Sequence, residues 1–381
     1  MTNKYKNHLC IVFAIEHYNP LGVIRSLGEA GVNPVFIGIK NRVRVASASK
    51  YISKCHKVET VEEGYKVLLD EYGDVYKTEE KPIIFCSDDK TTGYLDERYD
   101  ELKDWFIFFN GGKAGRLSEY MDKNNILKLA KKHDLDVLEA RTLQHGEVPD
   151  DLVYPIITKA ISPNSGAWKA DVHICKNAQE LKTAYDHIES PEILVQRFID
   201  KKTEYVLEGF CAAHGTIFIA SIESTYKYNI TGYYSPYMNC KNFTDKDLEA
   251  KLAAMTSEIG FEGIFEIEFL IDQDDKKYFS EINFRNSTWS YASTVAGMPL
   301  PILWADAMLS GKLDKEKIYR MLPVNYTAMV EPIDYGKRVK TGTIDLAQWL
   351  VDFKETNCGY YYSKDDIEPW RVMVENFEKL S

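Results

Sequence analysis

Acidic, amide and basic side chains recur at alternate positions in two neighbouring segments, 263–272 and 277–285. They are Glu266, Glu268, Glu281, Asn283 and Arg285. Both segments alternate imperfectly between apolar and polar residues, and the turn-like residues 273–275 separate them, which predicts a β-hairpin. Side chains two residues apart share one face of a strand, so we expect these groups on one surface.

The chemistry of this surface has two interpretations. Carboxylate and amide oxygens are the ligands that Mg²⁺ accepts, usually together with substrate phosphates. An arginine beside them suits the charge of a phosphoryl group. The same alternation is common in half-buried sheets, so a solvated face that happens to carry charge is the competing interpretation.

Lys159 stands in a strand-like and mostly apolar run at 154–160. A lysine there must reach solvent or find an anionic partner, which makes it more informative than a lysine on a polar helix. Residues 162–168, which follow, are rich in small residues whose backbone N–H groups and hydroxyls suit a phosphate. That segment is not a Walker A sequence, and an ordinary turn is its alternative interpretation.

The composition of the 381 residues excludes several classes of partner. A net charge of −11 argues against nucleic acid or an anionic membrane as the partner. No apolar run approaches transmembrane length, and residues 1–8 are too polar for a signal peptide. Seven scattered cysteines without a C-x-x-C pair indicate reduced thiols. We therefore expect a cytoplasmic protein.

The N-terminal part alternates between strand-like and helix-like segments. Strands are expected at 9–15, 33–39, 55–58, 82–87 and 105–110, and helices after the first strand, at 60–76 and at 92–103. This order predicts a parallel sheet with helices on both faces, whose ligands lie beyond the carboxyl ends of the strands. The loops 16–19 and 87–92 are therefore the ones to examine. The first lacks a G-x-G-x-x-G pattern, which disfavours a dehydrogenase.

The composition changes at 111–115, and the later elements follow a less regular order. Helices are expected at 117–133, 177–188, 244–259 (capped by Thr244) and 295–310, and around 346–354 and 370–380; strands at 154–160, 172–175 and 193–199; and a second hairpin at 204–213 and 216–226. We expect four units: 1–115, 116–200, 201–310 and a helical extension at 311–381.

The order of these features, over roughly residues 9–309, resembles the ATP-grasp superfamily. The hairpin is similar to that family's metal-binding strand pair. The resemblance implies an α/β fold with a Rossmann-like pre-ATP-grasp domain, an α+β lid and a nucleotide- and metal-binding region. It further implies that Glu268, Glu281 and Asn283 hold Mg²⁺, with Mn²⁺ as an alternative, and that Arg285 contacts the transferred phosphate or the acyl phosphate.

The resemblance also assigns the expected ATP site. Lys123 and Lys159 are similar to the family's two nucleotide lysines, and Ser165 and Gly166 belong to the loop that would cover the phosphates. The segment Gln196, Arg197, Phe198 and Ile199 resembles the hinge that pairs with adenine, and Glu204 matches the ribose-binding acid. Lys227 resembles a third lysine of the dipeptide-ligase branch. Arg285, Lys159 and Lys227 are the implied catalytic residues.

The resemblance implies an ATP-dependent carboxylate–amine ligase that forms an acyl phosphate from a small acid and joins it to an amine. Phe284 stands where many relatives have proline, and the polar and aromatic residues 286–291 follow Arg285. This departure leaves the acceptor open, although the loop is similar to the D-aspartate-ligase-like and D-Ala-D-Ala-ligase-like group. A bicarbonate-using carboxylase and an ATP-binding module without chemistry are the alternatives. A homodimer is one expected assembly.

Overall fold

The computed structural model describes residues 4–73, 80–161, 170–230 and 234–380. Its N-terminal sheet is parallel, with the strand order β3-β2-β1-β4. The strands are β1 (Cys10–Ile15), β2 (Val35–Ile39), β3 (Lys54–Val58) and β4 (Ile83–Phe85), joined by α1 (Tyr18–Glu29), α2 (Val61–Tyr72) and the 3₁₀ turn η2 (Ala46–Ala48), after η1 (Lys4–Asn7). Strands β1 and β2 are almost wholly apolar because helices cover both faces of the sheet. The expected parallel sheet is confirmed.

Two expectations for the end of this domain are wrong. The helix expected at 92–103 is two helices, α3 (Asp89–Asp96) and α4 (Tyr99–Leu102). Helix α3 begins earlier than expected because the Asp88 side chain caps it by accepting a hydrogen bond from Thr91 N. The strand expected at 105–110 is reduced to single bridges. Ile107 pairs with Ile83, and Asn110 pairs with Glu262 of the next sheet, so the segment crosses between sheets.

The helix expected at 117–133 is also interrupted, into α5 (Arg116–Met121) and α6 (Lys123–Lys132). Asp122 has extended backbone and caps α6 by accepting from Asn125 N at 3.0 Å. A four-stranded sheet of order β5-β8-β6-β7 follows. It consists of β5 (Ala140–Gln144), β6 (Ile156–Ala160), β7 (Ile174–Cys175) and β8 (Glu192–Arg197), with α7 (Ala178–Ala184). Strand β5 had no counterpart in the sequence prediction.

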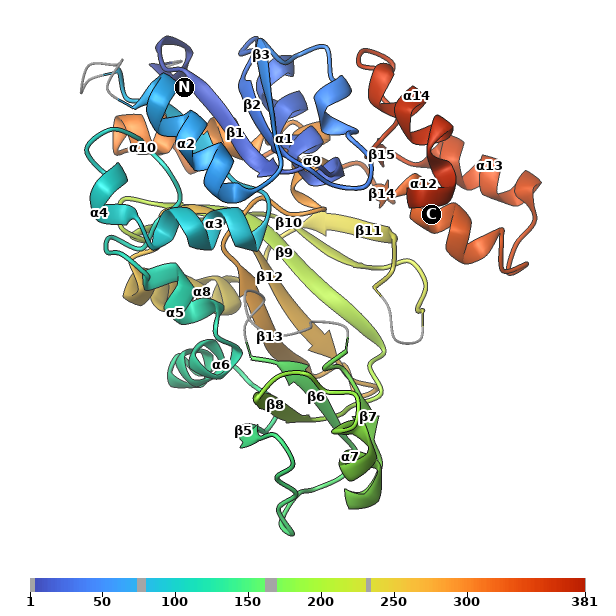
Figure 1. Cartoon of the computed structure of the whole chain (residues 1–381). Helices are drawn as coiled ribbons and strands as arrows, with labels where there is room; N and C mark the ends of the chain where they lie inside the picture. The colour runs from blue at the N-terminus through green and yellow to red at the C-terminus, as the bar shows by residue number, and fades with distance from the viewer. Residues whose placement is uncertain (1–3, 74–79, 162–169, 231–233, 381) are drawn as a thin grey trace.

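The central sheet has seven strands in the order β13-β12-β9-β10-β11-β14-β15. They are β9 (Thr203–Ala212), β10 (Ile217–Tyr226), β11 (Tyr237–Asn242), β12 (Gly263–Ile271), β13 (Lys277–Asn283), β14 (Thr327–Met329) and β15 (Cys358–Gly359). Both expected hairpins, β9–β10 and β12–β13, are confirmed. In Figure 1 this sheet lies between the N-terminal domain above and the β5–β8 sheet below.

The remaining helices lie around the central sheet and at the C-terminus. They are α8 (Lys246–Ile259), α9 (Ser290–Val295), α10 (Leu300–Ser310), α11 (Lys315–Ile318), α12 (Glu331–Arg338), α13 (Leu346–Glu355), α14 (Glu368–Glu375) and α15 (Phe377–Leu380). The cap of α8 is Asp245 rather than Thr244. The helix expected at 295–310 begins at Leu300, because Pro299 has extended backbone. Among the described residues, every helix is too short or too polar to cross a membrane.

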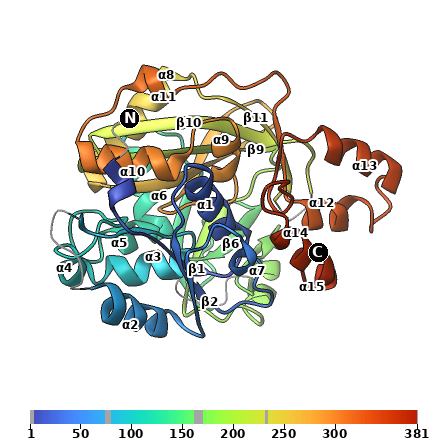
Figure 2. The ribbon, with the colours of Figure 1, turned by 90° about the horizontal axis from the view of Figure 1, so that it is seen from above.

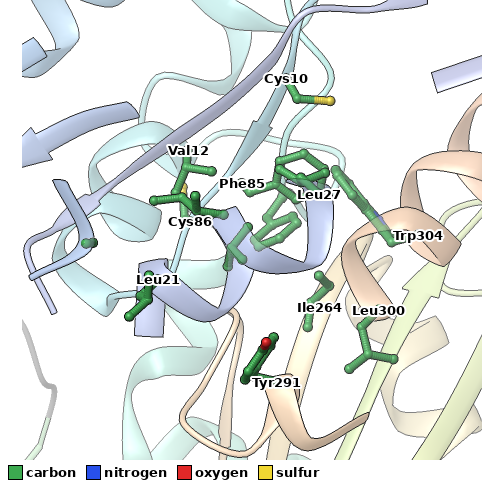
Figure 3. Packing of buried hydrophobic residues seen from close by; sticks show 14 of the residues in the cluster. Cys10, Val12, Leu21, Leu27, Phe85, Cys86, Ile264, Tyr291, Leu300 and Trp304 are labelled. Carbon is green, nitrogen blue, oxygen red and sulfur yellow. The ribbon is translucent and has the colours of Figure 1, made fainter. Parts of the chain in front are cut away.

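One core joins the N-terminal domain to the central sheet. Trp304 of α10 lies edge-on to Phe85 and to Phe109, with ring centroids 5.5 and 4.8 Å apart, and Ile264 of β12 belongs to the same cluster (Figure 3). The C-terminal segment is tied to the N-terminal domain by a second contact: buried Arg25 donates to the Asp366 carboxylate at 2.9 Å and to Tyr360 O at 2.8 Å. Figure 2 shows α12–α15 at one side of this body. These contacts join the N-terminal domain both to the central sheet and to the C-terminal segment.

Candidate functional site

The β12–β13 hairpin places the polar residues in register. Glu268 lies opposite Glu281 and Glu266 lies opposite Asn283, with a bulge after Glu268. Asn283 Nδ2 donates to Oε1 of both Glu266 and Glu268 at 3.1 Å. Its amide oxygen accepts from Arg285 Nη2 at 3.2 Å. The hairpin therefore brings the five side chains together; to face a cation as well, the amide oxygen of Asn283 must turn from Arg285 toward the two carboxylates.

Two lysines from other elements face these carboxylates. Lys123, at the start of α6, has its Nζ 3.5 Å from Glu281 Oε2. Lys159 of β6 donates to Gln196 Oε1 at 3.0 Å and lies close enough to Glu281 to interact electrostatically. Burial lowers the pKa of Lys159, and the Glu281 charge opposes that shift. The lysine that the sequence singled out in an apolar strand thus lies in an acidic surrounding.

The carboxylates on the two strands differ in their protonation. Burial alone would raise the pKa of Glu281, but the cations of Lys123, Lys159 and Arg285 hold it below the usual value. Burial raises the pKa of Glu268 well above the usual value, and the charge of Glu281 adds to this rise. The neighbouring cations thus favour the ionised form of Glu281, whereas burial and the charge of Glu281 favour the neutral form of Glu268.

These oxygens fit a hard divalent cation only if other ligands complete its shell. Among the described residues, no group of three or more His, Cys, Asp or Glu side chains is arranged to hold a metal. The predicted set is instead two partly exposed carboxylates and an amide, Glu268, Glu281 and Asn283. Mg²⁺ is commonly held by one or two carboxylates together with water and phosphate oxygens, so the donor set fits this ion.

The remaining residues of the expected nucleotide site lie along β8 and at the start of β9. Gln196 is buried and faces Lys159, while Arg197 is exposed. Phe198 and Ile199 follow the end of β8, and Phe198 N donates to Pro155 O at 2.9 Å. The Glu204 carboxylate accepts hydrogen bonds from Tyr226 OH and Lys201 Nζ. Ser165 and Gly166 lie outside the described residues.

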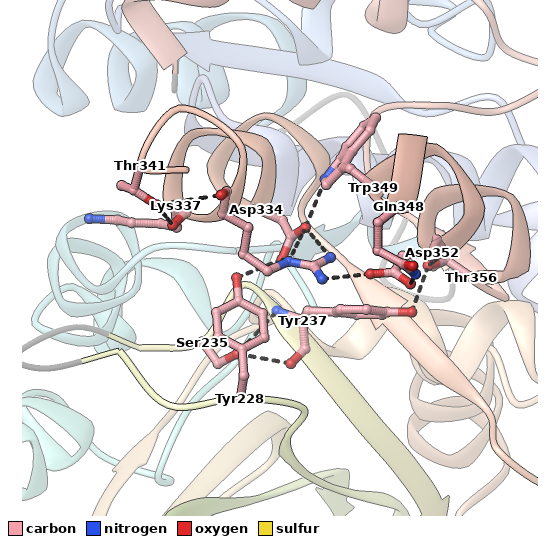
Figure 4. A network of polar contacts seen from close by, with 11 residues as sticks. Tyr228, Ser235, Tyr237, Asp334, Lys337, Thr341, Gln348, Trp349, Asp352 and Thr356 are labelled. Atoms are coloured by element: carbon pink, nitrogen blue, oxygen red, sulfur yellow. Dashed lines mark hydrogen bonds and ion pairs between the residues drawn. The ribbon is translucent and has the colours of Figure 1, made fainter. Parts of the chain in front are cut away.

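Lys227 follows directly after the end of β10. It is exposed, with its Nζ 5.9 Å from the centroid of the Tyr237 ring. The next residue, Tyr228, donates through its hydroxyl to Asp334 of α12 at 2.6 Å, and Trp349 Nε1 donates to the same carboxylate at 2.9 Å (Figure 4). Tyr228 is therefore anchored to the C-terminal helices of its own chain.

A cavity of about 170 Å³ lies where the two N-terminal loops meet Arg285. His17, Ser87 and Asp89 are among its lining residues. Arg285 Nε donates to Asp89 Oδ1 at 2.7 Å, and its Nη2 donates to Oδ2 at 3.2 Å. Glu16 does not line it, because its buried carboxylate accepts from Ala46 N at 2.9 Å. The carboxyl-end rule identified both loops, but the sequence did not identify Asp89 as the partner of Arg285.

A second buried carboxyl pair also escaped the sequence prediction. Glu208 of β9 lies opposite Glu266 of β12 in the sheet register. The Glu208 carboxylate accepts from Ser287 Oγ and Ser290 Oγ, both at 2.6 Å. Burial raises the pKa of Glu208 to about 6 and that of Glu266 well above the usual value. The polar residues of the loop after Arg285 were the feature of the sequence that could have indicated hydrogen-bond donors for a buried carboxylate.

The sequence comparison finds similarity to curated proteins over part of the chain. Over 148 residues the chain is 29% identical to formate-dependent phosphoribosylglycinamide formyltransferase of Bacillus velezensis. The aligned stretch covers 36% of this chain and 37% of that protein, so it spans just over a third of each. No protein-family profile matches the chain.

Solved structures match over most of the chain. L-amino acid ligase from Bacillus licheniformis superposes with a TM-score of 0.61 at 11% identity, covering 82% of this chain and 78% of the ligase. N5-carboxyaminoimidazole synthetase from Staphylococcus aureus gives 0.61 at 13% identity, covering 88% and 86%. Biotin carboxylase from Campylobacter jejuni gives 0.62 at 15% identity, covering 81% and 73%. At these identities the superpositions establish a common fold and leave activity to be argued from the site.

Proposed function

We propose that this chain is an ATP-dependent carboxylate–amine ligase. The proposal starts from the ATP-grasp fold that the chain shares with those enzymes. The chain activates a small acid as an acyl phosphate and transfers the acyl group to an amine. The observation that carries this proposal is the convergence of Glu281, Lys123, Lys159 and Arg285 from three separate elements. Such a group suits a reaction in which two anions, a triphosphate and a carboxylate, must approach each other.

The nucleotide is held between the β5–β8 sheet and the central sheet. Lys123 and Lys159 neutralise its phosphates, and the residues from Gln196 to Ile199 contact the base. Glu204 accepts hydrogen bonds from the ribose hydroxyls, and Ser165 and Gly166 belong to the segment that covers the phosphates. Glu268, Glu281 and Asn283 would hold Mg²⁺, or Mn²⁺ in its place, which would supply charge neutralisation of the phosphoryl group.

The residues of the chain perform the rest of the work by positioning and charge. Arg285 stabilises the negative charge on the transferred phosphoryl group, and Lys159 stabilises it from the opposite sheet. Lys227 serves as the third cation when the substrates are bound. Exclusion of water from the site protects the acyl phosphate until the amine attacks its carbonyl carbon. Phosphate then leaves with the electrons of the carbon–oxygen bond, and the amine loses a proton as the amide forms.

The named activities of the similar proteins support this class of reaction and define one alternative. One of these proteins is an L-amino acid ligase and another is a formate-dependent formyltransferase. Others are carboxylases, including the 2-oxoglutarate carboxylase domain solved with bicarbonate. A bicarbonate-dependent activity is therefore the second candidate function. An enzyme that consumes ATP in either reaction is expected in the cytoplasm, with small molecules as its partners and a homodimer as its assembly.

A screen for ADP release tests the proposal. Purified protein with Mg²⁺ and ATP is assayed against pairs of small acids and primary amines, with and without added bicarbonate. We expect ADP release that requires both an acid and an amine and is lost in Glu281→Gln. Release that requires bicarbonate in place of the acid would establish the carboxylase alternative. ATP binding without ADP release for any pair would establish a binding module without chemistry.

A further inference from the structure

We propose that Tyr226 and Lys201 position the Glu204 carboxylate, and that this positioning lets the protein distinguish a nucleotide with ribose hydroxyls from one without them. The inference rests on the proposed function, in which Glu204 accepts hydrogen bonds from the ribose, and it adds the two residues that set this specificity. Both act through Glu204 and are therefore positioning residues. Their contacts fix both oxygens of the Glu204 carboxylate.

The sheet register places Tyr226 beside Glu204. Strands β9 and β10 pair antiparallel, with Thr225 opposite Tyr205. At the end of this pairing Tyr226 N donates to Thr203 Oγ1 at 3.0 Å, so Tyr226 is held next to the residue that precedes Glu204. The strand pairing thus brings the tyrosine side chain to the carboxylate.

Within the described ranges, one donor reaches each oxygen of the Glu204 carboxylate. Tyr226 OH donates to Oε2, and Lys201 Nζ donates to Oε1. The ammonium of Lys201 also lies 5.4 Å from the centroid of the Tyr226 ring, so the three side chains form one cluster. A carboxylate offers about four acceptor positions, so about two remain for a ligand. The two hydroxyls of one ribose match that number.

Burial makes the hydroxyl contact persistent and leaves the carboxylate within reach of a ligand. Tyr226 is 8% exposed, whereas the side chains of Glu204 and Lys201 are 16% and 28% exposed. Burial raises the pKa of Tyr226 above its usual value, and the charge of Glu204 adds to this rise, so the hydroxyl stays protonated at neutral pH and donates. A partly exposed ion pair alone holds a carboxylate weakly. The buried hydroxyl therefore contributes more to the orientation of Glu204 than the lysine does.

Glu204 lies on the same face of the central sheet as the proposed metal residues. In the register of β9 and β12 it stands opposite Leu270, two positions from the pair of Val206 and Glu268, and side chains two residues apart share a face. The charge of Glu204 also contributes to the raised pKa of Glu268 and opposes the lowering of the pKa of Lys159. The carboxylate for the ribose thus lies on the surface proposed for the phosphates, as a single nucleotide requires.

The binding of two nucleotides to the full chain tests the inference. The probes are MgATP and its 2′,3′-dideoxy analogue, which lacks both ribose hydroxyls, and isothermal titration calorimetry measures the two dissociation constants. Their ratio reports the hydroxyl contacts, because the base and the phosphates are the same. We expect wild type to bind the analogue at least about tenfold more weakly, the size of a hydrogen bond to a charged group. A wild-type ratio near one would overturn the inference.

Substitutions separate positioning from a structural role. Tyr226→Phe removes the hydroxyl and Lys201→Met removes the ammonium, and both keep most of the side-chain volume. We expect both variants to lower the ratio, Tyr226→Phe by more than about threefold because its hydroxyl is the buried contact. Loss of packing alone would weaken both nucleotides equally and leave the ratio unchanged. An unchanged ratio in one variant would remove that residue from the assignment, and an unchanged ratio in both would overturn the inference.

A double-mutant cycle shows whether Tyr226 acts through Glu204. In the Glu204→Ala background, Tyr226→Phe should change the affinity for MgATP by less than about twofold, because the carboxylate that the hydroxyl orients is gone. An equal loss of affinity in both backgrounds would mean independent effects and would overturn the positioning role. The matched control is Tyr65→Phe, which removes a hydroxyl that donates to Glu101 at 2.8 Å in the N-terminal domain, and it should keep the wild-type ratio.

The same samples separate this inference from the proposed function. If wild type does not bind MgATP, both fail together. If wild type consumes MgATP with an acid and an amine, but the ratio is the same in Tyr226→Phe and Lys201→Met, the positioning role alone fails. In steady-state turnover we expect Tyr226→Phe to raise KM for ATP with kcat within about twofold of wild type, because ribose contacts are equal in the ground and transition states. A fall in kcat at unchanged KM would overturn the inference.

Discussion

Two pairs of glutamates lie side by side on the central sheet, and their surroundings separate them. Glu268 faces Glu281 across β12 and β13, and Glu266 faces Glu208 across β12 and β9. The first pair lies opposite Lys123 and Lys159, which come from other elements. The second pair is closed by the hydroxyls of the loop after Arg285. Equal residue types thus stand at neighbouring positions in different chemical environments.

The difference decides which pair is available for chemistry. Cations keep Glu281 ionised in spite of burial. In the other pair, burial raises the pKa of Glu208 to about 6 and the pKa of Glu266 well above its usual value, and the two carboxyl groups are hydrogen-bonded to each other. A shared proton relieves the repulsion within that pair. We infer that Glu268 and Glu281 serve the reaction, while Glu208 and Glu266 fix the strands beneath it.

Neutralising Glu281 tests most directly whether the two glutamate pairs differ in function. Glu281→Gln removes an ionised oxygen ligand while keeping the volume of the side chain. We expect Mg²⁺-dependent ATP turnover to fall by a factor on the order of 10²–10³, the size expected when a group that stabilises transition-state charge is lost. Steady-state ADP release at saturating Mg²⁺ measures it, with circular dichroism to confirm folding.

The matched control is Glu355→Gln, at the exposed end of α13. It should turn over ATP at the wild-type rate. Turnover by Glu281→Gln within about threefold of wild type, with the protein folded, would show that Glu281 is not a metal ligand and that the two glutamate pairs do not differ in function.

The hairpin could be predicted because its information is local. Period-two alternation fixes which side chains share a face, and the structure places Glu266, Glu268, Glu281 and Asn283 on paired positions of the two strands. The break before α6 was also within reach, since Asp122 is a favourable cap at the position where the helix restarts. Element type and face are thus properties of a short stretch of chain.

The division between the two glutamate pairs was not within reach of the sequence. It depends on Glu208 from another strand and on serines from the loop after Arg285. The pairing of Arg285 with Asp89 likewise joins two sheets that the chain visits far apart. A local sequence pattern does not show which distant loops come into contact. The pKa of a buried carboxyl group depends on those contacts, so it could not be predicted from the sequence.

A second prediction tests whether the lysines keep Glu281 of the first pair ionised. Lys123→Met removes the cation 3.5 Å from Glu281. We expect apparent ATP affinity to fall by about 10–100-fold, because a phosphate contact and a charge are lost together. The pKa of Glu281 should rise, so protons should compete with Mg²⁺ more strongly at pH 6 than at pH 8.

Titrations of ATP and of Mg²⁺ at both pH values measure the two effects. Lys132→Met is the control, since Lys132 lies on the same helix and is paired with Glu258 at the surface. If Lys123→Met shifts the Mg²⁺ requirement equally at pH 6 and pH 8, Lys123 does not control the ionisation of Glu281.

A third prediction concerns Glu266, the member of the second pair that shares the Asn283 amide group with Glu268 of the first pair. Glu266→Gln retains an oxygen to accept from Asn283 Nδ2, as Glu266 Oε1 does at 3.1 Å. Because burial raises the pKa of Glu266 well above its usual value and so favours the neutral form, which the amide resembles, we expect turnover to fall by no more than about tenfold, the order of an outer-shell substitution around a metal. Glu266→Ala removes the acceptor and should cost more. A loss as large as that of Glu281→Gln would make Glu266 a ligand and merge the two pairs.

The smallest expected effect is on the pH dependence of stability through Glu208. Its pKa is about 6 in the folded protein, raised by burial above an ordinary value of 4.5. The folded state therefore binds a proton that the unfolded state releases, and this stabilisation is present below pH 4.5 and lost as pH rises through 6. Wild type should lose about 1 kcal/mol of unfolding free energy between pH 5 and pH 8 that Glu208→Gln retains, because a neutral amide does not titrate.

Urea unfolding of both proteins at the two pH values measures this difference, with Glu355→Gln as the exposed reference. Parallel loss of stability in wild type and Glu208→Gln would mean that Glu208 is already ionised at pH 5, as Glu281 of the first pair is.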